Sequence, residues 1–422
     1  MSDSSTPLDR YVRSMRRSRT VYYAVLGVIL AALIVIAALV WTNGEAAHAT
    51  LHTVDQQPAA LTVTTPTATQ AQAWRTADRT AAGTPVWRGT VITYSTHTVS
   101  GRDARTGART WSYDRSDRTV CTAAQIAGVT VAIYQRDRSC DEVSAFDSGT
   151  GRRKWTRTLD ENGQPVDGRP DFQFNGTTML VPTSSAVYAI DPGSGIDRWT
   201  YNRVGCTIEH AVLGTAGVLI SQDCTDVDCA NVKFCGKGRQ LLLRDPTAER
   251  LDDDKPNFDQ ITWNDIGNTG VPVSADTVVS AVQPGSNVLD TLNPADGKLV
   301  HAVQLKPAPT DLDRISPAST DTTQYLWIDG RLSALTAGSA SPLWSVATVA
   351  APTVETPDGI DLGANSAVRI TVPTSTGVAT LDPATGKASG RFTVPAPAAG
   401  STVWRLGGGF LVSSRSGTVA YR

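Results

Sequence analysis

The six cysteines are the residues whose type and spacing point most directly to chemistry. They are Cys121, Cys140, Cys206, Cys224, Cys229 and Cys235. All six follow a long apolar segment near the N-terminus, so a membrane anchor there would place them on one side of the membrane. An even number of cysteines in an oxidising compartment is typical of disulfide bonds, and we predict that all six are paired.

A zinc site is the alternative use of three of these cysteines. Cys224, Cys229 and Cys235, together with His210, offer the sulfur and nitrogen ligands that zinc takes. Their spacing matches no familiar zinc pattern, and the repeats of the chain give Cys224 a different partner. We therefore favour disulfide bonds and predict no metal site.

Other residue types that commonly carry catalysis form no recognisable motif. The sequence has neither a Gly-x-Ser-x-Gly elbow for a serine nucleophile nor a Cys-x-x-Cys-His haem site. His97, His210 and His301 fall in three different repeats, and we interpret each as a residue on a strand surface. Asp252–Asp254 and Asp259 suggest calcium but lack the Gly and final Glu of a calcium loop. We predict no catalytic residue and no cofactor.

The apolar segment that precedes the cysteines predicts a membrane anchor. Residues Val21–Trp41 carry no charge, and about 20 apolar residues cross a bilayer as a helix. Five arginines precede the segment and the next Lys or Arg after it is Arg75, so the N-terminus should be cytoplasmic. We predict a basic tail at 1–20 and a single transmembrane helix at 21–42. The alternative is a cleaved signal peptide ending near Ala47–Ala49.

Residues 43–70 are rich in Ala, Thr, Gln and Pro and have few large apolar side chains. Such a composition buries too little apolar surface to fold alone, so we expect a disordered stalk. The whole chain is 41% hydrophobic and 18% charged, which is enough for a real core beyond the stalk. Its net charge of -2 argues against a nucleic-acid partner.

Beyond the stalk, one pattern recurs seven times. Each copy has an alternating apolar run and then a turn of the Asp-Pro-x-x-Gly type, and in four copies a Trp follows. The equivalent turn residues are Asp103, Asp147, Asp191, Asp245, Asn293, Thr336 and Asp382. They are 44, 44, 54, 48, 43 and 46 residues apart, a period typical of propeller blades of four antiparallel strands, A to D.

The two ends of residues 71–422 complete an eighth repeat. Ala73-Trp74-Arg75 resembles a lone D strand, and residues 417–422 resemble a C strand that lacks its D strand. Pairing these segments would close the ring and remove its exposed sheet edges. We therefore predict an all-β, eight-bladed β-propeller, with a seven-bladed ring as the alternative.

The repeats also predict how the cysteines pair. Cys121 and Cys140 are 19 residues apart in the second repeat, and Cys206 and Cys224 are 18 apart in the fourth. In each pair the first cysteine begins strand A and the second ends strand B, and antiparallel strands bring these ends together. We predict the bonds Cys121–Cys140 and Cys206–Cys224, which leaves Cys229–Cys235 to close an inserted loop.

These repeats resemble the pyrroloquinoline-quinone (PQQ) repeat family, whose motif is roughly Ala-x-Asp-x-x-Thr-Gly-x-x-x-Trp. The resemblance covers about residues 70–422 and is clearest in 99–111, 143–155, 187–199 and 378–392. It implies an eight-bladed ring of a kind found in quinoprotein dehydrogenases and in non-enzymatic relatives such as the outer-membrane assembly lipoprotein BamB. Arg outnumbers Lys, as in members from GC-rich bacteria such as actinobacteria.

The resemblance leaves two functions to compare. Quinoprotein dehydrogenases carry an adjacent Cys-Cys pair against their cofactor, and this sequence has no such dipeptide. We therefore expect a non-catalytic, extracytoplasmic scaffold that binds a protein or another envelope component. The alternative is a PQQ-dependent dehydrogenase-like enzyme or a sensor that holds a small ligand over the central channel.

The candidate binding loop is the insertion in the fourth repeat. Loops on a rigid ring are where recognition is usually placed, and this loop offers one aromatic and three cationic side chains. They are Lys233, Phe234, Lys237 and Arg239. The alternative is that the nearby disulfides only stiffen a poorly packed insertion.

Overall fold

The computed structural model describes residues 22–23, 25–35, 45–62, 64–161, 164–165, 172–202, 205–224, 238–244, 261–263, 270–283, 286–294, 297–306, 315–320, 322–355, 369–398 and 400–422. The chain divides into two compact units. One comprises Met1–Thr50 and Asp114–Asp117, and the other comprises Leu51–Tyr113 and Arg118–Arg422.

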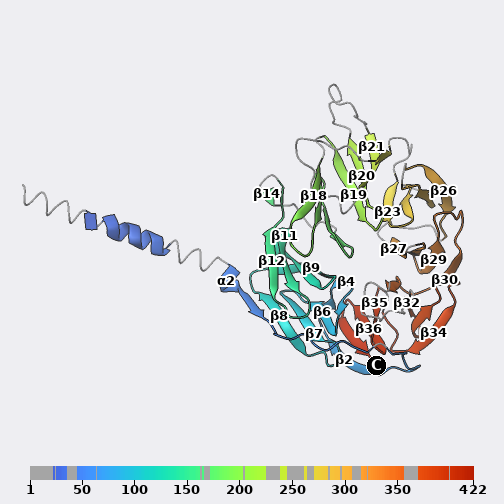
Figure 1. Cartoon of the computed structure of the whole chain (residues 1–422), viewed down its shortest axis with the longest axis horizontal. Coiled ribbons are helices and arrows are strands. Elements are labelled where there is room, and N and C mark those ends of the chain that lie inside the picture. The colour runs from blue at the N-terminus through green and yellow to red at the C-terminus, as the bar shows by residue number, and fades with distance from the viewer. Residues whose placement is uncertain are drawn as a thin grey trace, which may run out of the picture. The chain divides into compact units, whose positions relative to one another are not determined.

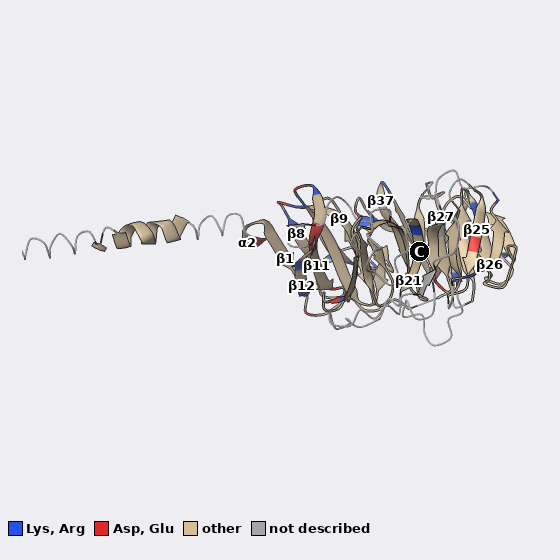
Figure 2. Cartoon of the chain, turned by 90° about the horizontal axis from the view of Figure 1, so that it is seen from above, with Lys and Arg blue, Asp and Glu red and all other residues tan. Residues whose placement is uncertain are grey.

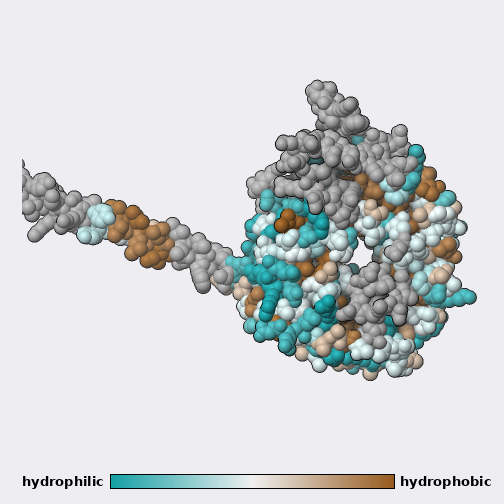
Figure 3. Space-filling view, viewed as in Figure 1, coloured by the Kyte–Doolittle hydropathy of each residue, from teal (hydrophilic) through white to brown (hydrophobic). Residues whose placement is uncertain are grey.

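The first unit contains the apolar segment. Residues 22–23 and 25–35 are helical, and their large apolar side chains are 51–70% exposed (Figure 3). A four-residue helix, α2 (Glu45–His48), follows, and the Ser116 amide donates to the His48 carbonyl at 3.0 Å. Within the described residues, the helices are too short or too polar to cross a membrane.

The second unit is a ring of eight antiparallel sheets (Figure 1), which confirms the eight-bladed prediction over the seven-bladed one. In blades three to seven, four consecutive strands run from A at the inner edge to D at the outer edge. Seen from the side in Figure 2, the strands run between two faces formed by turns, and basic and acidic residues are mixed.

Blades one to four follow the chain in order. Blade one contains β3 (Arg79–Thr80), β5 (Val86–Trp87), β6 (Thr90–Tyr94), β7 (Thr98–Asp103) and β8 (Arg109–Arg115), and its sheet includes β1 (Ala49–His52). Blade two contains β9 (Thr119–Ile126), β10 (Val129–Arg136), β11 (Ser139–Asp147) and β12 (Arg153–Thr158), with β4 (Ala82–Gly83) parallel to β9. After the hairpin β13 (Asp160–Glu161) and β14 (Gln164–Pro165), blade three contains β15 (Gln173–Phe174), β16 (Met179–Pro182), β17 (Ala186–Ile190) and β18 (Asp197–Asn202). Blade four contains β19 (Thr207–Leu213), β20 (Val218–Cys224), β21 (Gly238–Arg244) and β22 (Ile261–Trp263).

Blades five to eight complete the ring. Blade five contains β23 (Val271–Ala275), β24 (Val279–Val282), β25 (Val288–Leu292) and β26 (Leu299–Gln304). Blade six contains β27 (Ile315–Ser319), β28 (Gln324–Ile328), β29 (Arg331–Leu335) and β30 (Trp344–Ala347). Blade seven contains β31 (Thr353–Glu355), β32 (Arg369–Thr374), β33 (Gly377–Leu381) and β34 (Ala388–Thr393). Blade eight contains β35 (Thr402–Leu406), β36 (Gly409–Ser414), β37 (Gly417–Tyr421) and β2 (Gln72–Thr76).

Blade eight joins the two ends of the propeller as predicted. Strand β2 pairs antiparallel with β37, with Trp74 opposite Ala420 and Gln72 opposite Tyr421. Ala71 and Arg422 exchange two further backbone hydrogen bonds of 2.8 Å each. The outer strand of the last blade therefore comes from the beginning of the domain, which closes the ring.

The Asp-x-x-x-Gly motif forms the turn between strands C and D. In blade two, one carboxylate oxygen of Asp147 accepts hydrogen bonds from the Thr150 amide at 2.9 Å and the Thr150 hydroxyl at 2.8 Å. Gly151 has a φ of +75°, which an L side chain rarely adopts. Asp103 and Asp382 hold the same turn in blades one and seven.

The tryptophan of each motif connects one blade to the next. Trp111 of blade one is fully buried and lies over Gly151 of blade two, and its indole N–H donates to the Ser148 carbonyl at 2.9 Å. Trp155 makes the equivalent bond to Pro192. Each indole ring packs on the C–D turn of the following blade. The apolar core is therefore a series of clusters between neighbouring blades.

Residues 51–62 and 64–70 differ from the stalk that the sequence predicts, because they lie along the propeller. The Val54 amide donates to the Thr150 carbonyl at 3.0 Å, and Asp55 pairs with Arg152 at 3.1 Å. Further contacts follow towards the ring closure: Arg105 donates to Ala60, Arg405 donates to Thr64, Leu61 packs against the cluster that contains Trp74, and Thr69 forms a bridge with Thr393. We call residues 51–62 and 64–70 the strap.

Backbone hydrogen bonds explain why the amino-acid composition of this segment wrongly predicts a disordered stalk. Most of the strap's contacts use its carbonyl and amide groups, which every sequence offers alike. A segment with few apolar side chains can therefore be held in place by a surface that is already folded.

Candidate binding surface

The propeller has two faces, and chain topology assigns each turn to one of them. In an antiparallel blade, the B–C turn and the link from strand D to the next strand A lie at one edge, and the A–B and C–D turns lie at the other. We call these the B–C face and the C–D face. The strap contacts Thr150 and Arg105 in C–D turns, and its Ala59 lies beside Gly89 in an A–B turn. The strap therefore lies on the C–D face.

Both disulfides that the described residues contain lie at the B–C face. Cys121–Cys140 has an S–S distance of 2.05 Å and Cys206–Cys224 one of 2.11 Å, so both pairings are confirmed. Cys140 lies in β11, opposite Gln135 of β10, rather than at the end of strand B as expected. The bond to Cys206 leaves Cys224 without the thiolate that a zinc site needs.

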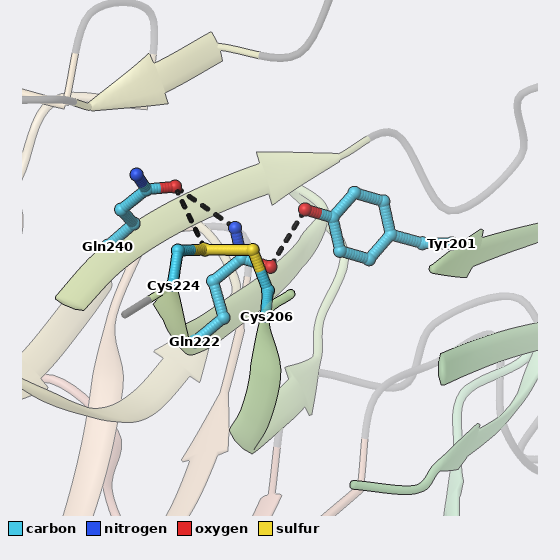
Figure 4. The surroundings of a disulfide bond; sticks show 5 residues. All are labelled: Tyr201, Cys206, Gln222, Cys224 and Gln240. Atoms are coloured by element: carbon cyan, nitrogen blue, oxygen red, sulfur yellow. Dashed lines mark hydrogen bonds between the residues drawn. A yellow bond between two sulfur atoms is a disulfide. The ribbon is translucent and has the colours of Figure 1, made fainter. Parts of the chain in front are cut away.

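A buried polar chain surrounds the second disulfide (Figure 4). The Tyr201 hydroxyl donates to Oε1 of Gln222 at 2.8 Å, and Nε2 of Gln222 donates to Oε1 of Gln240 at 3.0 Å. The Cys224 sulfur lies 3.8 Å from the same Gln240 oxygen. A disulfide sulfur carries no hydrogen, so we treat this last approach as a contact only. The chain links blade three to strands B and C of blade four at the base of the inserted loop.

The candidate loop is only partly within the described residues. Lys233, Phe234 and Lys237 lie outside them, and so do both cysteines of the predicted Cys229–Cys235 bond. Arg239, at the start of β21, lies 3.3 Å from Glu209 and 3.9 Å from Asp223 of its own blade. We therefore assign Arg239 a role in holding β21 against β19 and β20.

The three histidines of the propeller lie apart, in blades one, four and five. His97 Nδ1 lies 2.6 Å from the Arg118 carbonyl, and His210 is exposed on β19. His301 is half-buried on β26. Over the part of the chain that the structure describes, no three His, Cys, Asp or Glu side chains lie close enough to hold a metal ion. Asp252–Asp254 and Asp259 fall outside that part.

The carboxylates with perturbed pKa values belong to the C–D turns. Burial raises the pKa of Asp191, but hydrogen bonds from Ser194 and the charge of Arg198 outweigh it and lower the pKa overall. Hydrogen bonds from the Thr385 hydroxyl and amide lower the pKa of Asp382. Since each carboxylate accepts bonds within its own turn, we assign both a structural role.

Similarity to solved structures is low in sequence. BamB from Moraxella catarrhalis is 17% identical with a TM-score of 0.45, and the match covers 83% of this chain and 99% of that one. A quinohaemoprotein alcohol dehydrogenase from Pseudomonas putida is 13% identical with a TM-score of 0.46, covering 87% and 78%. A WD40 domain from Neurospora crassa is 12% identical with a TM-score of 0.41, covering 72% and 88%.

Comparison with curated protein sequences finds no match. The family model described as outer membrane protein assembly factor BamB matches residues 59–234 and 250–419. The matched residues begin within the strap and reach almost to the end of β37, so they include strands of all eight blades, although β21 of blade four falls between the two matched stretches. Because most of the chain is matched, the protein belongs to the BamB family of PQQ-like β-propellers.

Proposed function

We propose that this protein is a non-catalytic binding protein of the cell envelope. Residues 21–42 hold it in the cytoplasmic membrane with residues 1–20 inside the cell, and the propeller lies outside. Its B–C face binds a protein partner. The uncharged run Val21–Trp41 and the arginines before it support the anchor, and two disulfides support an oxidising location.

The observation that carries the choice of face is the position of the strap. It contacts blades two, one, eight and seven at their C–D and A–B turns or outer edge. These turns are therefore already covered by the protein's own chain over part of the ring. The B–C face carries both disulfides and the insertion between β20 and β21, and such a stiffened, loop-bearing surface suits recognition.

Family membership favours a protein as the partner. The family description names an assembly factor of outer membrane proteins, and we carry over only the general role of binding another protein. The sequence lacks the adjacent cysteines of quinoprotein dehydrogenases, so we do not propose an enzyme.

Site-specific photo-crosslinking in intact cells tests the assigned face. A photoreactive residue replaces Arg138 or Ser416, both exposed in B–C turns, and matched variants carry it at Ser194 or Ala384, both exposed in C–D turns. We expect the same partner to be crosslinked from both B–C positions and from neither C–D position. Crosslinks of equal yield from the two faces would contradict the proposal.

Membrane anchoring has its own test. Alkaline carbonate washing of membranes should leave the full chain in the pellet, and protease added to spheroplasts should digest the propeller. Release by carbonate, or protection of the propeller from protease in intact spheroplasts, would contradict the anchor and its orientation.

A further inference from the structure

A cleft opens between blades five and six, away from both disulfides. Its volume is about 870 Å³. Strand β26 and the residues after it form one wall, and strands β28 and β29 with the following turn form the other. Its lining includes Val303, Lys306, Arg331, Ser333, Leu335 and Ala340.

The cleft lies where the repeat loses two aromatic side chains. At the junction of blades one and two, Trp111 and Tyr113 are fully buried. At the junction of blades three and four, Trp199 and Tyr201 are 2% and 4% exposed. Each pair occupies the same two places in strand D, and in β26 these places are taken by His301 and Val303.

Strand register supports this equivalence. Trp155 pairs with Ala145, and a bulge separates it from the Arg153–Phe146 pair. His301 pairs with Thr291, and the same kind of bulge separates it from the Leu299–Leu292 pair. Since Ala145 and Thr291 both lie two residues before their turn residue, His301 stands where the motif tryptophan stands.

Blade six still has the apolar surface against which an aromatic ring of strand β26 would pack. In blade two, Trp111 lies against Phe146 and Gly151. The corresponding positions of blade six are Leu335 and Ala340, counted from the turn residue Thr336, and both line the cleft. The junction therefore keeps the apolar surface of an aromatic slot while lacking the residues that fill it elsewhere.

The floor of the cleft is apolar and its rim is polar and mainly cationic. Val303 and Leu335 are each 1% exposed. Ser333 and Ser345 also line the cleft, with their hydroxyls 3.1 Å apart. Of the charged residues that line the cleft in the described part of the chain, Lys306 and Arg331 are basic and Asp329 is acidic.

Exposed apolar side chains lie close to the cleft in the sequence, at the start of β26 and just before β30. Leu299 and Val300 at the start of β26 are 53% and 42% exposed, and Leu343 before β30 is 53% exposed. Figure 3 shows hydrophobic residues at this edge of the ring, beside β26. Apolar surface outside a pocket favours a polypeptide over an isolated small molecule, because a chain covers the slot and its surroundings together.

We propose that this cleft binds an aromatic side chain of a partner polypeptide whose neighbouring residues are acidic. The ring takes the place that Trp111 and Tyr113 hold at the first junction, and carboxylates beside it pair with Lys306 and Arg331. Aromatic anchors in desolvated pockets dominate many protein interfaces. The proposal deepens the function proposed above, because Lys306 in the link after β26 and Arg331 at the start of β29 both lie at the B–C face. The experiment below measures binding to the cleft itself, so its result is independent of which face crosslinks to a partner in cells.

Fluorine NMR with the purified full chain in detergent tests this site. The probe is acetyl-Glu-(5-fluorotryptophan)-Glu-amide. We expect its fluorine signal to broaden with the natural protein and to sharpen with Val303→Trp, which fills the cleft. Charge reversal at the exposed rim, Lys306→Glu with Arg331→Glu, should weaken probe binding at least tenfold without unfolding the protein.

Matched probes and a matched variant separate this binding from adsorption to micelles. Acetyl-Lys-(5-fluorotryptophan)-Lys-amide and acetyl-Glu-(trifluoroleucine)-Glu-amide should bind at least tenfold more weakly. Charge reversal at Arg415, which is exposed in a B–C turn of blade eight, should leave binding unchanged. The proposal would be overturned if the natural protein gave no broadening of the fluorine signal. It would also be overturned if the Val303→Trp variant and the charge-reversed variant broadened the signal as much as the natural protein does.

Discussion

Trp111 of blade one lies directly against Gly151 of blade two, so close that a Cβ atom on Gly151 would come within 2.6 Å of the indole ring. Trp155 and Gly195 repeat this contact at the next junction. The glycine is thus required twice, by the positive φ of its turn and by the ring above it. This pair connects the motif in the sequence with the packing of whole blades.

Replacing this glycine should destabilise the propeller. Gly151→Ala places a side chain at a φ of +75° and against Trp111, and we expect a loss of about 2–4 kcal/mol in the free energy of unfolding. Gly338→Ala is the matched control, because no atom lies within 4 Å of its added Cβ. Denaturant unfolding of the full chain measures both, and equal stability of the two variants would show that the ring contact does not matter.

Trp74, at the closure of the propeller, should contribute as much to stability as the motif tryptophans of the other blades. Trp74 is 7% exposed and donates to the Ala104 carbonyl at 3.1 Å. We expect Trp74→Ala to cost about 3–5 kcal/mol and Trp74→Phe, which keeps the packing but loses the hydrogen bond, to cost less. Ala73→Ser on the exposed side of β2 is the control. If Trp74→Ala left the free energy of unfolding unchanged, the pairing of β2 with β37 would contribute little to the stability of the propeller.

Removal of the second disulfide should lower stability. The loop between Cys206 and Cys224 spans 18 residues, and cross-links of this size stabilise by about 3 kcal/mol. We expect the double variant Cys206→Ser, Cys224→Ser to unfold at a lower temperature than the natural protein. The double variant keeps the Cys121–Cys140 bond, so a reducing agent should lower the melting temperature of the natural protein by more than that of the double variant. An equal change in the two proteins would contradict the Cys206–Cys224 bond.

Acid should weaken the C–D turns. Hydrogen bonds from Thr385 lower the pKa of Asp382 in the folded protein, below an unfolded value of about 3.9. The stabilisation is therefore present above pH 4 and is lost as pH falls through the folded pKa. We expect Asp382→Asn to lower the melting temperature at pH 7 and to have less effect at pH 3. An equal effect at both values would exclude the carboxylate charge as the cause.

The sequence predicts the regular part of the molecule well because particular residue types recur at fixed positions of each repeat. Asp147, Gly151 and Trp155 each have one physical task, and their spacing carries over from blade to blade. The closure of β2 onto β37 is predictable for the same reason, since Trp74 belongs to the motif. Two disulfide pairings follow from the equivalence of blades two and four.

The strap and the cleft are missed for opposite reasons. The strap is held largely through backbone groups of residues such as Val54, Ala60 and Thr64, which leave no pattern in the sequence. The cleft does leave a signal, because His301 occupies the place of the motif tryptophan. Its meaning depends on neighbouring residues of blade six, which only the folded ring brings together.

The closed ring is the claim on which both binding sites depend, and amide hydrogen exchange of the natural full chain tests it most directly. The account predicts that those amides of residues 72–76 that face β37 exchange as slowly as the amides of residues 417–421, because the two segments are hydrogen-bonded to each other. Exchange of every amide of residues 72–76 within seconds, while the rest of blade eight stays protected, would contradict it.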